Sequence, residues 1–181
     1  MRLALLALVL LGNVQGEYLP SRKGANWVYR SGSQAVIQTV AGTERVGGAN
    51  CVILETNRGG KKERMWIQNS RGGLQIRKVL SRGAVNELRS PALLLKFPLK
   101  RGDSWKARIP FGNDVVEYSY RNLGPEKIRV PAGEFQAWKI QASGQVAGSR
   151  FSQVSWYSGK TGWMVKQTTD GRVMELKKYS R

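Results

Sequence analysis

The residue inventory leaves few groups that could do chemistry. The chain has no histidine, so it lacks the usual general base, the usual partner of a nucleophile and the commonest metal ligand. Asp103, Asp114 and Glu117 remain as carboxylates for a glycan-cleaving acid and base. The two aspartates stand in segments typical of turns, where an aspartate commonly bonds its own backbone. We therefore expect no enzymatic activity, no bound metal and no cofactor.

A second candidate motif is Gly159-Lys160-Thr161, which matches the end of a phosphate-binding loop. The full motif requires a glycine five residues before Gly159, and Val154 occupies that position. The next segment has the pattern of a strand, so no helix N-terminus would face a phosphate. We interpret these residues as a hairpin turn, and the Arg-Gly-Gly segments at 58–60 and 71–73 as basic hairpin tips.

The N-terminus has the pattern of a secretory signal peptide. A short basic start precedes the apolar run Leu3–Leu11, and Val14 and Gly16 are residues of the kind that a signal peptidase reads. The run falls well short of the roughly 20 residues needed to cross a bilayer. We predict a signal peptide at 1–16 and a mature chain at 17–181 without a transmembrane segment. The expected location is periplasmic or secreted.

Positive charge is the most unusual property of the chain. Thirty Lys and Arg residues against 12 Asp and Glu residues give a formal net charge of +18. Such a field attracts polyanions and anionic surfaces without selecting among them. For an exported protein the candidate partners are anionic lipid, lipopolysaccharide, wall polymer or an envelope protein, and nucleic acid is disfavoured. The cations are spread along the chain, so a role in solubility alone is the alternative.

Cys51 is the single cysteine, so the chain contains no internal disulfide. It begins the apolar segment Cys51–Leu54, which has the pattern of a buried strand, and a buried free thiol behaves as a small apolar residue. An intermolecular disulfide is the alternative. The mature chain is long enough to bury a core without such links.

The mature chain has the pattern of one all-β domain. Short segments with alternating apolar and polar residues recur almost to the end, and no helical apolar stripe follows the signal peptide. Asp170-Gly171 between two such segments is a strong hairpin signal. We predict a single antiparallel meander with little helix, curled into a half-barrel or barrel, with a sandwich as the alternative. The expected strands span residues 26–30, 35–41, 50–56, 62–69, 73–80, 104–109, 115–122, 135–143, 150–157, 164–169 and 172–179.

The segment Ser81–Lys100 interrupts this alternation of apolar and polar residues. It contains an apolar stretch that ends in Phe97, and Pro91 and Pro98 exclude a long helix there. We interpret the segment as a buried connection between strands. The alternative is a plug that covers an open end of the barrel.

Two phrases of the second half carry a resemblance: VPAGEF at 130–135 and WYSGKTGWMVK at 156–166. They resemble patterns of exported bacterial β-sheet proteins of unknown function, whose sheets are similar to the lipoprotein-carrier half-barrel of the LolA and LolB type. The resemblance extends over Leu93–Tyr179 and implies a fold more than a function. Glu134 replaces the usual small threonine, and the lipidation cysteine of the lipoprotein members is absent. Both departures weaken the transfer of a lipoprotein-handling role.

Large aromatic residues on strands with one dry and one wet face are our candidate ligand contacts, with packing of the core as the alternative. They are Trp66, Tyr118, Tyr120, Trp138, Trp156 and Trp163. The leading hypothesis is a non-enzymatic envelope binding protein whose curved sheet presents an apolar concavity, rimmed by Lys and Arg, to an amphiphilic or anionic ligand such as a lipid or lipoprotein. The alternative is an adaptor in envelope assembly that pairs a sheet edge with a partner strand. An enzyme acting on the cell wall has no residue evidence in its favour.

Overall fold

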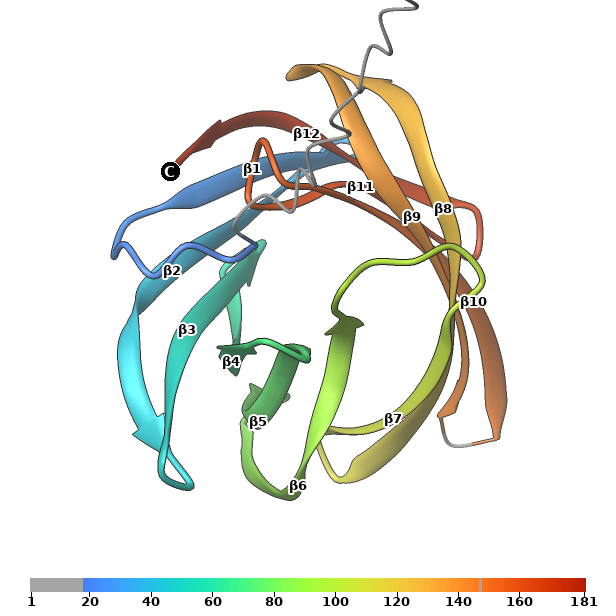
Figure 1. Cartoon of the computed structure of the whole chain (residues 1–181). Coiled ribbons are helices and arrows are strands. Elements are labelled where there is room, and N and C mark those ends of the chain that lie inside the picture. Colours follow the sequence, from blue (N-terminus) through green and yellow to red (C-terminus); the bar gives the residue numbers. More distant parts are fainter. Residues whose placement is uncertain (1–17, 147) are drawn as a thin grey trace, which may run out of the picture.

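The computed structural model describes residues 18–146 and 148–181, and these form one antiparallel sheet with no helix (Figure 1). The predicted signal peptide and its cleavage site lie outside the described residues. The strands are β1 (Asn26–Ser31), β2 (Gln34–Val46), β3 (Ala49–Arg58), β4 (Lys61–Ser70), β5 (Gly73–Ser81), β6 (Ala84–Lys96), β7 (Ser104–Phe111), β8 (Asp114–Val130), β9 (Gly133–Val146), β10 (Ser149–Ser158), β11 (Trp163–Thr169) and β12 (Arg172–Ser180).

The 12 strands form a meander that curls into a nearly closed barrel, as predicted (Figure 1). Each strand from β1 to β6 pairs with its neighbours in sequence, as does each strand from β7 to β12, and β1 also pairs with β12, so Asn26 lies opposite Ser180. The sheet therefore ends at β6 and β7. These two strands face each other without a backbone ladder. The indole Nε1 of Trp105 spans this seam and donates to the carbonyl of Leu93 at 3.1 Å.

Strand β6 corrects our interpretation of Ser81–Lys100 as a connection between strands. Most of that segment is a strand paired with β5. Its proline is tolerated because the register shifts between Ile76, which pairs with Ala92, and Lys78, which pairs with Glu87. Pro91 lies in the stretch between these pairs, and no ladder occupies the other edge of the strand.

Aromatic side chains fill the interior of the barrel and bond within it. Trp27 and Tyr29 are fully buried, and Trp163 is nearly so. The indole Nε1 of Trp27 donates to the carbonyl of Thr161 at 3.0 Å, and the Tyr29 hydroxyl donates to the carbonyl of Met164 at 2.8 Å. The indole of Trp163 donates to the side-chain oxygen of Gln38 at 2.7 Å. The polar atoms of these large rings are therefore satisfied inside the core.

The segment Tyr18–Pro20 is buried at one end of the barrel. The amide of Leu19 donates to the carbonyl of Gly162 at 2.6 Å, and the Asn69 side chain donates to the carbonyl of Tyr18 at 2.7 Å. The Tyr18 ring lies 5.4 Å from the ring of Phe97, at the end of β6. Tyr18 and Phe97, which belongs to the segment Ser81–Lys100, therefore pack together at this end of the barrel.

The barrel consists of two halves of similar design, β1–β6 and β7–β12. The ladder between β2 and β3 shifts register just before Gly42, and the ladder between β8 and β9 shifts just before Gly124. The ladder between β4 and β5 shifts directly after Trp66, and that between β10 and β11 directly after Trp156. Because bulges bend and twist a sheet, shared bulge positions give the two halves the same curvature.

Candidate functional site

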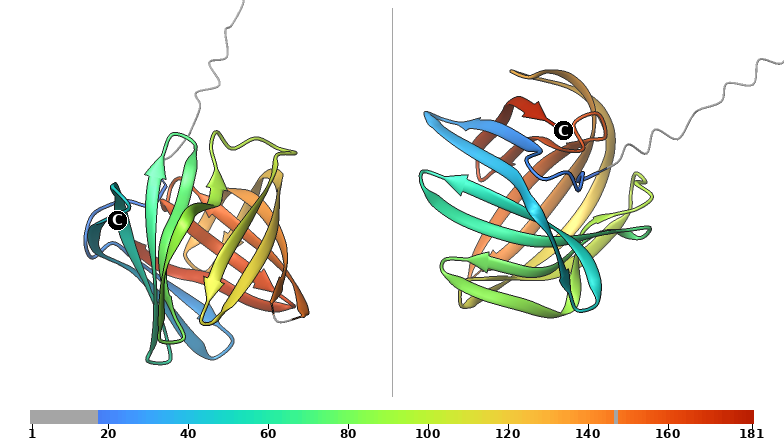
Figure 2. Two further views of the ribbon diagram at one scale, coloured as in Figure 1. Left: turned by 90° about the horizontal axis from the view of Figure 1, so that it is seen from below. Right: turned by 90° about the vertical axis from the view of Figure 1, so that its left-hand side faces the viewer.

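One end of the barrel gathers positive charge. Consecutive strands run in opposite directions, so the N-terminal segment, the β4–β5 turn, the β6–β7 loop and the β10–β11 turn lie at the same end, uppermost in the left view of Figure 2. Exposed cations occupy these connections, and we call them the basic end: Arg22, Lys23, Arg71, Lys100, Arg101 and Lys160. None of them forms an ion pair with a carboxylate of the described residues.

The acidic residues near this end already have partners. Asp103 pairs with Lys96 at 3.1 Å. Glu134, beside the β8–β9 turn, pairs with Lys127 at 2.8 Å and also with Arg129. Hydrogen bonds from these two cations lower the pKa of Glu134 to about 2, so this carboxylate stays charged and neutralised by its neighbours. The unpaired cations of the basic end therefore determine the sign of its field.

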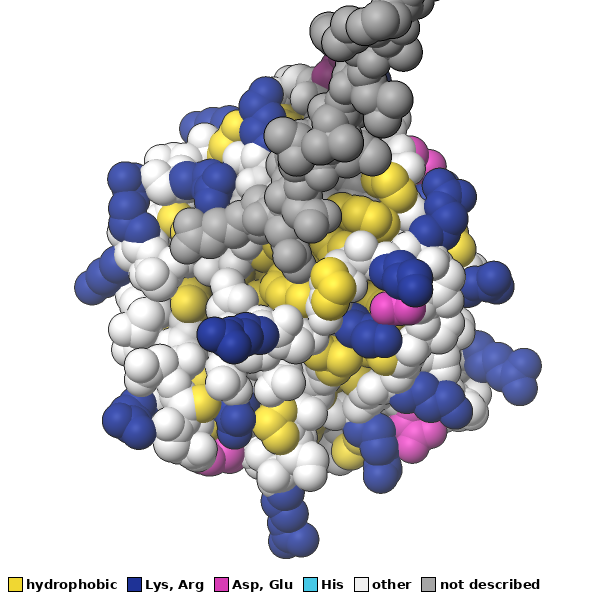
Figure 3. Space-filling view, in the orientation of Figure 1, with side chains coloured by type: hydrophobic (Ala, Val, Ile, Leu, Met, Phe, Trp, Pro, Cys, Tyr) yellow, Lys and Arg dark blue, Asp and Glu magenta, His cyan; other side chains and the backbone are white. Residues whose placement is uncertain are grey.

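Apolar residues occupy the middle of the same end. Phe97 and Leu99 of the β6–β7 loop are half-buried, and Pro98 between them is exposed. Figure 3 looks onto this end and shows hydrophobic side chains toward its middle with Lys and Arg side chains around them. An apolar tip among cations can contact an interface that is anionic outside and apolar inside.

The aromatic residues predicted as ligand contacts do not converge on one site. Tyr118 and Tyr120 lie on the inner face of β8 with their rings stacked at 5.4 Å. Trp163 packs in the interior against Tyr157, with ring centroids 5.6 Å apart. Trp138 is half-buried in β9. Whether any of them contacts a ligand stays a prediction.

Trp66 and Trp156 stand at corresponding positions of the two halves and are both nearly buried, Trp66 in a small cluster with Val46 and Cys51 and Trp156 in the main core cluster. The indole of Trp66 donates to Glu44 at 2.7 Å, and the Lys78 ammonium lies 4.4 Å from its ring centroid. Hydrogen bonds from Lys78 and then Trp66 lower the pKa of Glu44. The indole of Trp156 donates likewise to Glu126 at 2.6 Å. Such closed clusters brace the wall and leave the ring faces covered.

The carboxylates considered for catalysis are also kept apart. Asp103 and Asp114 flank opposite ends of β7, and Glu117 pairs with Arg108 at 3.2 Å on the outer wall. Within the described part of the chain, no group of three or more Cys, Asp or Glu residues is close enough to hold a metal ion. The geometry at the basic end suits binding of an anionic surface.

No protein-family model matches the chain, and no curated protein is significantly similar to it. Among solved structures, a Bacteroides fragilis protein described as a candidate exported protein with a YmcC-like fold superposes with a TM-score of 0.60 at 13% identity, over 92% of this chain and 100% of its own. The fold is YmcC-like.

A candidate lipoprotein of Parabacteroides distasonis also superposes on this YmcC-like barrel, with a TM-score of 0.50 at 14% identity over 91% of this chain and 99% of its own. At this identity the likeness concerns the fold alone. It confirms the predicted resemblance to exported bacterial β-sheet proteins, while the more specific resemblance to LolA and LolB stays a prediction. No helix among residues 18–146 and 148–181 is long and apolar enough to cross a membrane.

Proposed function

We propose that this YmcC-like barrel is a non-enzymatic envelope protein that binds an anionic lipid surface through its basic end. The observation that carries the proposal is the set of exposed cations without carboxylate partners, placed around the apolar tip at Pro98 and Leu99. An envelope location is the expectation from the N-terminal sequence. The filled interior favours contact at the end of the barrel over a lipid held inside it.

The expected salt dependence follows from the two kinds of contact. Each cation near an anionic bilayer contributes about 1 kcal/mol, and salt screens this attraction over about 8 Å at physiological ionic strength. Contact of the apolar tip with the interface is much less sensitive to salt. Binding should therefore be strong at low salt, weaken steeply as salt is added and retain a small residual component.

The test compares two quadruple variants of equal charge in co-sedimentation with liposomes. The first carries Arg22→Gln, Lys23→Gln, Lys100→Gln and Arg101→Gln. The control carries substitutions at the opposite end, at exposed cations that also lack carboxylate partners: Arg58→Gln, Lys61→Gln, Arg150→Gln and Arg172→Gln. The first should lose anionic-liposome affinity by roughly two to three orders of magnitude, and the control by less than about tenfold.

Two outcomes would overturn the proposal. Equal losses in both variants would show that the net charge acts without a preferred face. Equal binding of the unmodified chain to neutral and anionic liposomes at low salt would exclude the electrostatic contact altogether.

The alternative function, an adaptor that pairs with a partner strand, would act at the seam between β6 and β7. Both strands present an edge without a ladder partner there, which is where an added strand would pair. Pro91 and Pro110 remove amide donors from these edges, and Trp105 covers the carbonyl of Leu93, so the seam is guarded against pairing. An adaptor would show slower amide exchange in β6 and β7 on binding its partner.

A further inference from the structure

A shallow hollow of about 460 Å³ lies on the outer wall of the second half, across β7, β8 and β9. The ladders align its polar residues in two rows across the three strands. One row is Ser104, Arg121 and Gln141, and the other is Lys106, Ser119 and Ser143. All of these residues are exposed. The hollow forms because short serine side chains lie between longer ones on the same face of the sheet.

An aromatic stack on the inner face supports the floor of the hollow. The rings of Trp105 and Tyr120 lie 5.2 Å apart and nearly parallel, and Tyr118 continues the stack at 5.4 Å from Tyr120. Phe151 closes it with an edge contact at 5.3 Å to Tyr118. The stack stiffens the backbone that carries the side chains of the hollow. Less conformational entropy is therefore lost when these side chains bind a ligand.

The hollow is positively charged, since Lys106 and Arg121 form no ion pair with any described residue. The nearest carboxylates along its strands have other partners. Glu117 pairs with Arg108, and Asp103 pairs with Lys96. No acidic residue lines the hollow. An anion that entered it would meet uncompensated charge.

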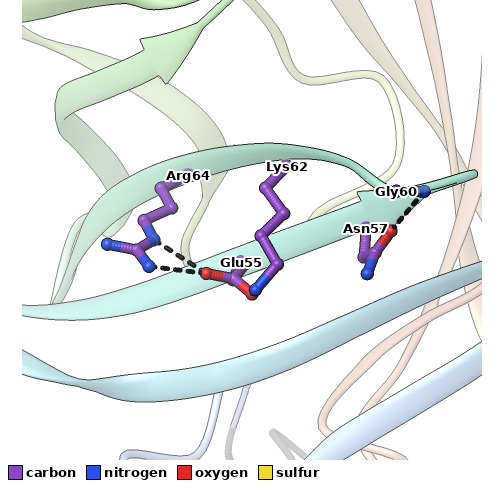
Figure 4. Close-up of polar contacts among 5 residues, drawn as sticks. All are labelled: Glu55, Asn57, Gly60, Lys62 and Arg64. Carbon is purple, nitrogen blue, oxygen red and sulfur yellow. Dashed lines mark hydrogen bonds and ion pairs between the residues drawn. The ribbon is translucent and has the colours of Figure 1, made fainter.

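The other half of the barrel shows that the fold does not require these residues. The corresponding ladders align Asn26, Thr39 and Glu55 in one row, and Val28, Ile37 and Asn57 in the other. That wall carries no cation in these rows. Figure 4 shows its carboxylate, Glu55, bonded to Arg64 at 2.8 Å and to Lys62 at 3.1 Å.

Hydrogen bonds from Arg64, and then from Lys62, lower the pKa of Glu55, so this wall is neutralised within itself. The two halves share their curvature and ladders, but of the two corresponding sets of rows only that of the second half carries unpaired cations beside hydroxyl groups. The composition of the hollow is therefore not a consequence of packing.

We propose that the hollow binds a short acidic oligosaccharide. The Arg121 guanidinium can engage a sugar carboxylate through two parallel hydrogen bonds, and the Lys106 ammonium acts as a second cation along the saccharide. The serine hydroxyls and the Gln141 amide match sugar hydroxyls as donors and acceptors. Its volume falls within the range of small-molecule sites, roughly 300–1,000 Å³. The hollow shares no residue with the basic end, which it adjoins at Ser104, and the proposal does not rest on lipid binding.

The test is calorimetric titration of the mature chain with trigalacturonate at physiological ionic strength, beside neutral galactotriose and inorganic phosphate. The charge variant carries Lys106→Val and Arg121→Thr, which install the residues of the corresponding positions Val28 and Thr39. It should lose at least tenfold in affinity for trigalacturonate. The control variant, Arg58→Gln with Lys61→Gln, removes the same charge at a distant turn and should keep its affinity within about twofold.

A second variant tests shape with the charge unchanged. Ser119→Ile installs the residue of the corresponding position Ile37 and fills the hollow, and should also weaken trigalacturonate binding at least tenfold. Both variants place β-favouring residues at exposed strand positions, so their thermal unfolding should match that of the unmodified chain. The quadruple variant of the basic end should still bind trigalacturonate.

Three results would overturn the proposal. The first is an affinity for galactotriose equal to that for trigalacturonate. The second is displacement of trigalacturonate by an equal concentration of inorganic phosphate, which would reveal simple anion attraction. The third is unchanged binding by the charge variant.

Discussion

At the residue scale, the buried Tyr29 hydroxyl offers a direct measure of how the interior is held. It donates to the carbonyl of Met164 at 2.8 Å. Burial, and to a smaller extent the neighbouring Tyr157, raises the pKa of Tyr29. Tyr29→Phe leaves that buried carbonyl without this donor and should lower the free energy of unfolding by about 1–3 kcal/mol in denaturant titrations. The matched control is Tyr120→Phe. The Tyr120 hydroxyl has no hydrogen bond to the described residues, so the loss should stay below about 1 kcal/mol. Equal losses of unfolding free energy in the two variants would show that the hydrogen bond from Tyr29 to Met164 does not stabilise the fold.

Single residues were predictable where alternation along one strand decides their face. The pattern of β8 predicts Tyr120 inside and Ser119 and Arg121 outside, and the structure places them so. The partners of Trp66 were not predictable in the same way. Glu44 belongs to β2, two strands from β4, and its approach depends on registers and bulges that have no local signal in the sequence.

At the scale of elements, the buried segment Tyr18–Pro20 should be sensitive to alkaline pH. Burial raises the pKa of Tyr18 to about 12, above its ordinary value near 10. The neutral phenol is thus favoured in the folded state. Its contribution to stability is complete below pH 10 and is lost as the pH rises through about 12.

Thermal unfolding measured between about pH 9 and pH 12 should isolate this contribution. The midpoint of the unmodified chain should fall more steeply than that of Tyr18→Phe, which lacks the ionising group. Other buried tyrosines shift in the same direction in both proteins, so only the difference between the curves reports on Tyr18. Parallel curves would show that Tyr18 stays in place when ionised.

Strand β6 shows where reasoning from single elements fails. Proline within an apolar run argues against a strand, and that argument holds for central strands with ladders on both sides. Pro91 is compatible with a strand because β6 is an edge of the sheet and bulges away from β5 at that point. Edge position is a property of the closed barrel, so no window of the sequence carries it.

At the scale of the molecule, the unladdered seam and the paired ends predict a successful circular permutant. Asn26 pairs with Ser180, so a short linker can join the C-terminus to the residues before β1. Opening the chain in the β6–β7 loop then breaks no ladder. A permutant that runs from Lys100 to Leu99 should melt cooperatively with a midpoint near that of the natural order. The control is opened at Ala132, within the long β8–β9 hairpin, and should be much less stable. Equal stabilities of the two permutants would show that the β6–β7 loop tolerates a chain break no better than the β8–β9 hairpin does.

The class of the whole molecule was predictable from its alternating segments and hairpin turns, and the antiparallel meander is confirmed. The twofold design was not, because the two halves agree in bulges and ladders more than in residues. On the outer walls, Thr39 of the first half corresponds to Arg121 of the second half, and Ile37 corresponds to Ser119. The two halves repeat the backbone geometry with different side chains, so a comparison of their amino-acid sequences does not detect the repeat.

The repeated wall also makes the valency of the protein adjustable. A chain with one hollow captures a polymer at one point, and a chain with two would crosslink it. The rows on the first wall have the alignment that such a second hollow needs, with Val28, Ile37, Thr39 and Glu55 in place of Lys106, Ser119, Arg121 and Gln141. Exchange of these residues would turn a monovalent barrel into a bivalent one without altering its backbone.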